Sequence, residues 1–310
     1  MKKIFSAVIL LGIALVFNQA YAQGVTDLTN DVRSAGMGDA YTALYGKGFS
    51  IYTNSAAAAL ADDDFAVSAN YTLWQPKMAG MNNFAVGAFY KFSDRYTVGL
   101  GARGLMQSIS NLTDSNGVPL GSDFTSTKIS VDASFGMRII DGFSAAINLH
   151  FFYDMVMPGT QGLGFGADLD LMYRHKYFNV ALSAKNLGPD ISYDSFTTSP
   201  LPMEIRAGYS GDYDVVDDIL DITPAVDVNY LINSSTVTAG AGAEFEFIDM
   251  ISLRAGYRFS ADNSWWPSYA TVGLGVEFFD FAIDAAYYIG TGSAADILTN
   301  SFKIGLSYRF

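Results

Sequence analysis

The residue types that could carry out catalysis are few and scattered. The chain has no cysteine and two histidines, so disulfides, thiolate metal sites and cysteine nucleophiles are excluded. Asn148 and His150 would be the candidates for a hydrolase, but His150 falls on the polar side of an alternating segment. No serine has the sequence context of a nucleophile elbow. The sequence therefore predicts a protein that is not an enzyme and needs no cofactor.

Metal and nucleotide sites are not expected either. His175 lies in a predicted turn beside Lys176, where a solvated side chain is favoured over a ligand. A run of aspartates could bind Ca²⁺ but lacks the spacing and the glycine of an EF-hand. Its members are Asp212, Asp214, Asp217, Asp218 and Asp221. Gly-x-Gly pairs such as Gly99 and Gly101 lie in predicted strands with no helix after them, which argues against a dinucleotide loop.

The composition indicates a membrane protein. Of the 310 residues, 50% are hydrophobic, 15% are aromatic and only 16% are charged, whereas soluble domains carry about 25% charged residues. The formal charge of −13 argues against nucleic acid as a partner, because neutralising phosphates requires clustered lysine and arginine.

The N-terminus has the pattern of a secretory signal peptide. Two lysines precede an apolar run from Ile4 to Phe17, and a small-x-small cleavage site ends at Ala22. We expect residues 1–22 to be removed after Ala22. Beyond residue 22 there is no stretch of 18 uncharged apolar residues, so spanning helices are not expected.

From Phe65 onward, hydrophobic residues recur with a period of two, which predicts strands with one apolar and one polar face. In the last segment, apolar residues from Phe302 to Phe310 alternate with Lys303, Ser307 and Arg309, among others. Fourteen strands are predicted, at 65–73, 84–92, 97–107, 128–140, 143–153, 162–174, 178–186, 203–211, 222–232, 236–248, 250–260, 269–279, 281–289 and 300–310.

These strands predict an all-β fold, a transmembrane antiparallel β-barrel of about 14 strands over residues 65–310. Strands of about 9 to 11 residues cross an outer membrane, and single-chain bacterial barrels have even strand numbers. Short and long links alternate, as a barrel with periplasmic termini requires, except at 233–235 and 212–221. The expected location is the outer membrane of a Gram-negative bacterium. The alternative is a soluble antiparallel sandwich, whose apolar faces would pack inward.

If the apolar faces contact lipid, the opposite faces place charges of both signs inside the barrel. The expected lumen charges include Arg103, Asp132, Arg138, Asp168, Asp170, Arg174, Glu244, Glu246, Arg254, Arg258 and Glu277. Unpaired charges in a confined lumen are costly, so we interpret these residues as a crosslinking network that stiffens the barrel. An ion-selective pore is the alternative interpretation.

Residues 23–64 precede the first strand and are too many for a simple tail. Two stretches of small residues, 34–43 and 55–61, suit a compact segment that tucks into the lumen as a plug. The motif residues of this segment are Arg33, Ser34, Gly36, Met37, Gly38, Ala40, Asn54 and Ala56.

This motif resembles the opening of the PorV/PorQ family of Bacteroidetes outer-membrane proteins and, more loosely, that of the related FadL-type transporters. In those families an arginine and a glycine-rich stretch precede an aromatic-Asn-Pro-Ala-Gly-Leu motif. Here Asn54 and Ala56 match, with Ser55 in place of the proline and Ala57 in place of the glycine. The resemblance implies a 14-stranded barrel behind this segment.

The resemblance implies two alternative functions. One is an accessory role in protein secretion of the type IX kind, in which the barrel binds secretion-system components or secreted cargo. The other is FadL-like transport, in which a hydrophobic ligand binds inside the barrel and leaves through its wall. Both imply outer-membrane lipid and the barrel-assembly machinery as partners, and the aromatic C-terminus, Tyr308 and Phe310, resembles the signal that this machinery reads.

Overall fold

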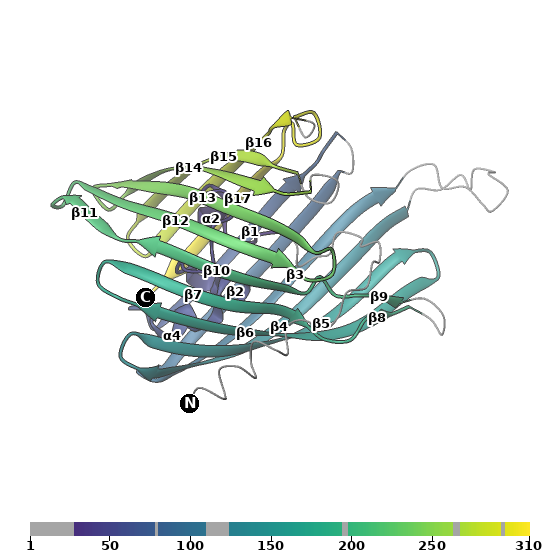
Figure 1. Cartoon of the computed structure of the whole chain (residues 1–310), viewed down its shortest axis with the longest axis horizontal. Coiled ribbons are helices and arrows are strands. Elements are labelled where there is room, and N and C mark those ends of the chain that lie inside the picture. The colour runs from purple at the N-terminus through teal and green to yellow at the C-terminus, as the bar shows by residue number, and fades with distance from the viewer. Residues whose placement is uncertain (1–27, 78–79, 110–123, 194–197, 263–266, 293–294) are drawn as a thin grey trace.

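The computed structural model describes residues 28–77, 80–109, 124–193, 198–262, 267–292 and 295–310. The predicted signal peptide lies outside these residues. Within them, one antiparallel sheet closes on itself, because β1 (Phe65–Trp74) pairs both with β2 (Met81–Ser93) and with β17 (Phe302–Arg309). The result is a barrel of oblique strands, with the C-terminus at one end (Figure 1).

Fourteen strands form the wall, which confirms the predicted transmembrane-type barrel and its strand number. Each predicted segment overlaps one of them, with ends that differ by at most four residues. The remaining wall strands are β3 (Tyr96–Ile109), β4 (Phe124–Ile140), β5 (Phe143–Met157), β6 (Thr160–Arg174), β7 (Phe178–Leu187), β10 (Glu204–Gly211), β12 (Leu220–Leu231), β13 (Thr236–Phe247), β14 (Ile251–Ser260), β15 (Tyr269–Phe278) and β16 (Phe281–Gly290).

The outside of the wall is apolar and the inside is polar. Leu100 and Phe165 are 69% and 65% exposed on the outer face, whereas Asp132 and His150 are 1% and 3% exposed. Successive side chains of a strand point to opposite faces, so each strand contributes to both surfaces. An apolar exterior on a closed barrel is the arrangement that lipid requires. The soluble sandwich is therefore wrong, because its apolar faces would be buried.

Short turns lie at the end of the barrel where the C-terminus is, and Gly142, with φ of +74°, supplies the left-handed conformation of one of them. The long link expected at 212–221 is not irregular. β11 (Tyr213–Val216) pairs with β12 and prolongs its hairpin beyond the wall (Figure 1). Pro224, which lies beside Gly211, cannot donate to the ladder, and this explains the break between β10 and β11.

At the other end, the chain between β7 and β10 turns into the barrel. β8 (Ile191–Ser192) and β9 (Thr198–Ser199), which the sequence did not predict, form a small hairpin there, and β8 also pairs with β6. Ile191 packs on the inner face of β6 at Gly162 and Gly164, where any side chain would collide with it. The wall strands are paired with both neighbours around the whole circumference of the described barrel.

A lipid-facing residue near the middle of a strand tests the orientation of the two faces. Leu149→Arg places a charge on the outer face of β5, where Leu149 is 56% exposed. We expect a loss of about 2 to 4 kcal/mol in the free energy of unfolding in lipid vesicles, measured by urea titration. Leu149→Ala is the control and keeps the face apolar. Equal stability of the two variants would contradict a lipid-facing position.

Candidate functional site

The segment from 28 to 64 lies inside the barrel and fills its lumen (Figure 1). It contains four short helices, namely α2 (Val32–Ala35), η1 (Lys47–Phe49), α3 (Ser50–Thr53) and α4 (Ser55–Ala59). Helices of this length are not stable alone, so contacts with the wall must hold them. Nearly every residue from 28 to 61 is buried. We call residues 28–64 the plug, and no helix in the described part of the chain is long and apolar enough to cross a membrane.

Side-chain caps begin two of the plug helices. Asp31 caps α2 by accepting a hydrogen bond from the Ser34 amide at 3.0 Å, and Asn54 Oδ1 caps α4 by accepting one from the Ala56 amide at 2.9 Å. Asn54 Nδ2 also donates to the Leu171 carbonyl of β6 at 3.3 Å. A single asparagine thus ends one turn, starts the next and ties both to the wall.

Glycines let the backbone of the plug touch the backbone of the wall. A Cβ atom on Gly256 would lie 2.2 Å from the Gly38 nitrogen, and one on Gly242 would lie 2.5 Å from the Met37 oxygen. Gly38 itself has φ of +71°, which favours glycine. Met37 and Ala40 are fully buried in this contact. The glycines of β13 and β14 therefore leave the space that the plug backbone occupies.

Glu244 is the main ionic contact between wall and plug. It accepts from Arg33 Nε of the plug at 3.0 Å and also from Arg254 of β14. Arg254 in turn donates to Asp284 at 2.6 Å. Glu244 is 2% exposed, so both arginines neutralise a carboxylate that water does not reach.

The next contact along the plug uses β14 and β15. Thr271 Oγ1 donates to the Gly36 carbonyl at 3.0 Å, and the Gly38 amide donates to the same hydroxyl at 2.9 Å. Arg258 forms an ion pair with Asp39 at 3.4 Å. Two motif glycines are thus fixed by one threonine of the wall.

Asp227 of β12 binds the turn that follows. It accepts hydrogen bonds from the Tyr41 amide at 3.0 Å and from the Thr42 amide at 2.9 Å. Arg206 of β10 donates to the same carboxylate at 3.0 Å, and its guanidinium lies 3.8 Å from the centre of the Tyr41 ring. The wall therefore satisfies plug amides that no helix of the plug satisfies.

His150, the candidate for catalysis, lies between two carboxylates. Its Nδ1 contacts Asp132 and its Nε2 lies 2.8 Å from Asp168, while Arg103 pairs with Asp132 at 3.3 Å. Ser130 donates to Asp132 at 2.8 Å rather than to the imidazole. Because both ring nitrogens face carboxylates, neither is directed at a hydroxyl group, and the arrangement is an ion network rather than a nucleophile and its base.

This network also ends at the plug. Lys185 lies between Asp168 and Asp170, at 3.3 and 3.5 Å. Asp170 accepts a hydrogen bond from the Ser55 amide at the start of α4 at 2.9 Å. Asn148, the other catalytic candidate, donates to the carbonyl of plug residue 51 at 2.7 Å. Its role in the structure is to hold the plug.

The remaining lumen charges lie toward the end with the short turns. Arg138 donates to the Ala59 carbonyl at 3.4 Å, and Arg174 donates to the Leu60 carbonyl and to Asp62, both at 2.7 Å. The Arg174 guanidinium holds the pKa of the Asp62 carboxyl below its usual range. These arginines close the C-terminal end of α4, where free carbonyls favour cations.

Glu277 and Glu246 complete the set. Glu277 accepts from Lys47 of the plug at 2.9 Å and pairs with Arg309. Glu246 has no cationic group within ion-pair distance among the described residues, although it shares a face of β13 with Glu244. The expected lumen charges thus differ in what they contact: some bind the plug, others such as Asp132 and Asp168 pair within the wall, and Glu246 faces an open hollow.

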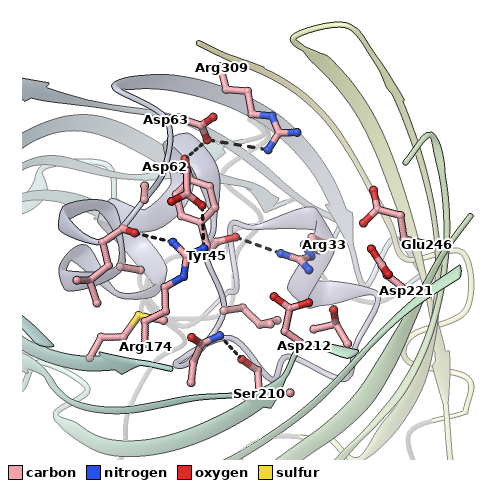
Figure 2. A pocket seen from close by; sticks show the side chains of 18 residues that line it. Arg33, Tyr45, Asp62, Asp63, Arg174, Ser210, Asp212, Asp221, Glu246 and Arg309 are labelled. Atoms are coloured by element: carbon pink, nitrogen blue, oxygen red, sulfur yellow. Dashed lines mark hydrogen bonds and ion pairs between the residues drawn. The ribbon is translucent and has the colours of Figure 1, made fainter. Parts of the chain in front are cut away.

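That hollow is a polar vestibule of about 250 Å³ between the plug and the wall, open at the end with the short turns (Figure 2). Three arginines line it and are already engaged, since Arg33 also donates to the Tyr45 carbonyl and the others, Arg174 and Arg309, pair as described. Asp212, Asp221 and Glu246 also line it, and Figure 2 draws no contact to any of them.

The other end of the lumen is closed by apolar side chains. Trp74 packs edge-on against Tyr269 and Tyr288, with ring centres 5.9 and 5.0 Å apart. Leu201 and Leu298 from the loops complete this cluster. The described residues of the outer mouth therefore form an apolar cluster.

The C-terminal aromatic residues lie on the outside of the wall. Phe310 is 61% exposed, and its ring lies 5.4 Å from Phe65 and 6.2 Å from Tyr308. Phe310 also bonds through its backbone to the first residues of β1. This position joins the two ends of the sheet, and recognition by an assembly machinery stays a prediction.

Sequence analysis missed the plug side of these contacts. Four of the contacts use plug residues that were not predicted, namely Asp39, Tyr41, Thr42 and Lys47. Thr271 of the wall was also overlooked. No spacing signal could have found them, because the residues that meet are about 185 to 235 positions apart. The interpretation of the charges as wall-to-wall crosslinks was incomplete, since many of them bind the plug.

Fold and site together define a class, the plugged outer-membrane β-barrel of 14 strands. Residues 163–308, from β6 to β17, match a family model described as "Type IX secretion system membrane protein PorP/SprF". The match supports a relation to type IX secretion membrane proteins but does not confirm PorV/PorQ specifically, and it covers slightly less than half of the chain. No curated protein sequence matches the chain.

Solved structures with the same fold include two toluene transporters. The Ralstonia pickettii protein TbuX is 14% identical, with a TM-score of 0.62, and the match covers 91% of this chain and 98% of TbuX. Pseudomonas putida TodX is 11% identical, with a TM-score of 0.65 and coverage of 95% and 99%. A Pseudomonas aeruginosa FadL homologue is 14% identical, with a TM-score of 0.60 and coverage of 91% and 99%. At such identities, the likeness shows the fold alone.

The close contact between the plug and Gly256 can be tested by adding one methyl group. Gly256→Ala places a Cβ against the backbone of residues 37 and 38, and overpacking of this kind destabilises by about 1 to 3 kcal/mol. We expect the plug to become sensitive to protease in the folded barrel. Gly104→Ala is the control, because its nearest neighbour would be 3.8 Å away. Equal protection of both variants would show that the plug does not depend on this contact.

Two glutamates on one face of β13 form a matched pair for the ionic contact. Glu244→Gln leaves Arg33 and Arg254 without their shared carboxylate, which we expect to reduce the free energy of unfolding by about 3 to 5 kcal/mol. Glu246→Gln removes a charge with no partner and should change it by less than about 0.5 kcal/mol. Urea unfolding in vesicles measures both, and similar losses in the two variants would contradict the anchoring role of Glu244.

Proposed function

We propose that this protein is a non-enzymatic outer-membrane component of protein secretion, related to the type IX system. The match of residues 163–308 to the PorP/SprF model carries the proposal. It is supported by a lumen that the plug fills and by a wall whose strands are all paired in the described barrel. A filled and closed barrel is suited to binding partners at its two ends.

The plug motif supports the same proposal independently. The family model covers residues from β6 onward, whereas the resemblance to PorV/PorQ rests on residues 33 to 60, so the two do not overlap. That this chain binds secreted cargo at the surface, as the resemblance to PorV and PorQ implies, stays a prediction. We also propose that residues 1–22 are cleaved during export and that Tyr308 and Phe310 direct assembly of the barrel.

Transport of a hydrophobic molecule is the second candidate, and the apolar outer mouth favours it. Trp74, Tyr269 and Tyr288 offer the ring faces that an aromatic hydrocarbon would contact. These rings pack directly against one another, so a ligand would have to separate them and displace the plug. For this reason we rank transport below secretion.

Deletion of the gene tests the main proposal. We expect the deletion strain to lose secreted proteins of the type IX class from the culture medium while other exported proteins remain. Quantitative mass spectrometry of the medium measures this, with the complemented strain as the control. An unchanged set of secreted proteins would overturn the proposal.

Liposomes carrying the purified barrel test transport separately. If the plug and the closed wall block passage, labelled toluene or fatty acid should enter no faster than into protein-free liposomes. Variants at the outer mouth, such as Trp74→Ala, should then make no difference. Rapid uptake that depends on Trp74 would favour the transporter instead.

A further inference from the structure

The hairpin of β11 and β12 leaves an unpaired strand edge at the rim of the barrel. β12 is covered on its other side by β13 as far as the pair Leu220 and Phe247. On the side of β7, the ladder ends when the Asp212 amide donates to the Tyr177 carbonyl at 3.1 Å. Beyond that point, β11 has no second neighbour among the described strands. Such an edge is a template for another extended chain.

The two faces of β11 differ in chemistry. Tyr213 lies on the outer face, because its hydroxyl is 3.1 Å from that of Tyr209, which is exposed on the lipid side. Side-chain alternation then places Asp214 on the opposite face, and the register of β11 against β12 shifts between Asp214 and Val216. Asp214 is paired in register with Asp221, which lines the vestibule. The edge therefore has an apolar outer side and an acidic inner side.

The carboxylates on the inner side form no ion pair among the described residues. They are Asp212, Asp221 and Glu246, and the arginines that line the same vestibule are engaged by other groups. The pKa of the Asp214 carboxyl is raised by partial desolvation and by the neighbouring carboxylates of Asp217 and others. Like charges held together in this way favour the arrival of a cationic group.

Apolar side chains are also exposed at this rim. Val215, Ile219 and Ile248 are 53%, 54% and 53% exposed, although the hairpin extends beyond the turns of the neighbouring strands (Figure 1). Residues past the wall are not covered by lipid tails. Exposed apolar side chains beside unpaired carboxylates suit a protein partner. A bare metal ion fits less well, since no group of three or more acidic or histidine side chains in the described residues could hold one.

We propose that the β11 edge binds an extended, lysine- or arginine-bearing segment of a periplasmic protein, which adds a strand to the hairpin. The end with the short turns and the C-terminus faces the periplasm in barrels of this class. The basic side chains of the added strand lie over the carboxylates of the vestibule, and its alternate apolar side chains lie beside Tyr213. This deepens the secretion proposal, on which it rests for the identity of the partner as a secretion component.

Synthetic peptides test the edge without knowledge of the partner. The probe is a fluorescent twelve-residue peptide of alternating lysine and valine, titrated against the full-length barrel in detergent with anisotropy as the readout. We expect saturable binding that weakens at high salt. A glutamate-valine peptide should not bind. A lysine-valine peptide with alternate backbone amides methylated should bind at least tenfold more weakly, because it cannot pair with the edge.

Two sets of variants with the same charge change locate the site. The triple variant Asp212→Asn, Asp214→Asn and Asp221→Asn removes two carboxylates of the vestibule and the neighbouring one of β11. It should weaken binding of the lysine-valine peptide at least tenfold. The control triple variant changes Asp94, Asp141 and Asp280, exposed residues in other turns of the same rim, to asparagine and should bind like the native protein. Heat-modifiable migration on gels checks that both variants are folded.

Several outcomes overturn the docking site. If the methylated peptide binds as tightly as the unmethylated one, strand addition is excluded. If both triple variants weaken binding equally, the peptide is attracted by net charge alone. Binding that survives in the vestibule variant excludes the carboxylates. These results are independent of the secretion assay: peptide binding with intact secretion in the deletion strain would refute only the proposed function, and lost secretion without peptide binding would refute only the docking site.

Discussion

One constraint governs this protein: its outer surface faces hydrocarbon, so polar groups must be satisfied on the inside of a closed sheet. The wall meets this requirement for its own backbone by closing between β1 and β17. The plug has no such solution, because its helices are single turns and many of its amides and carbonyls have no partner within it. The charged inner face of the wall supplies those partners, and Glu244, Asp227 and Asp170 each bind the plug directly.

The charges and the plug are therefore one structural unit. Each wall carboxylate that accepts from the plug is also paired with a basic residue of the wall, as Asp227 is with Arg206. With the plug in place these carboxylates are out of water, and the contacts from both plug and wall compensate the unfavourable burial of their charge. The lumen is for this reason better understood as a packed core made of polar residues than as a channel. Partners are then expected at the ends of the barrel.

The two ends differ in a way that suits this view. At the outer mouth, Trp74, Tyr269 and Tyr288 belong to one buried apolar cluster. The periplasmic end keeps an open vestibule, a hairpin that extends past the wall and a set of acidic residues that form no ion pair within the described part of the chain. The chemistry of that end, acidic on one face and apolar on the other, specifies what kind of segment could attach there.

The sequence by itself determined the strands, their two faces and the expected plug, since alternation over short distances depends only on the environment of each face. It also placed Glu244 and Asp170 on the inner face. It could not decide what those charges bind, because Arg33 and Glu244 are 211 positions apart and no local pattern records such a contact. Nor could it tell that 212–221 holds a strand, as Asp-rich composition suggests a solvated turn. Only closure of the barrel decided these points, because closure brings distant charges into one confined space and leaves β11 at its rim with an open edge.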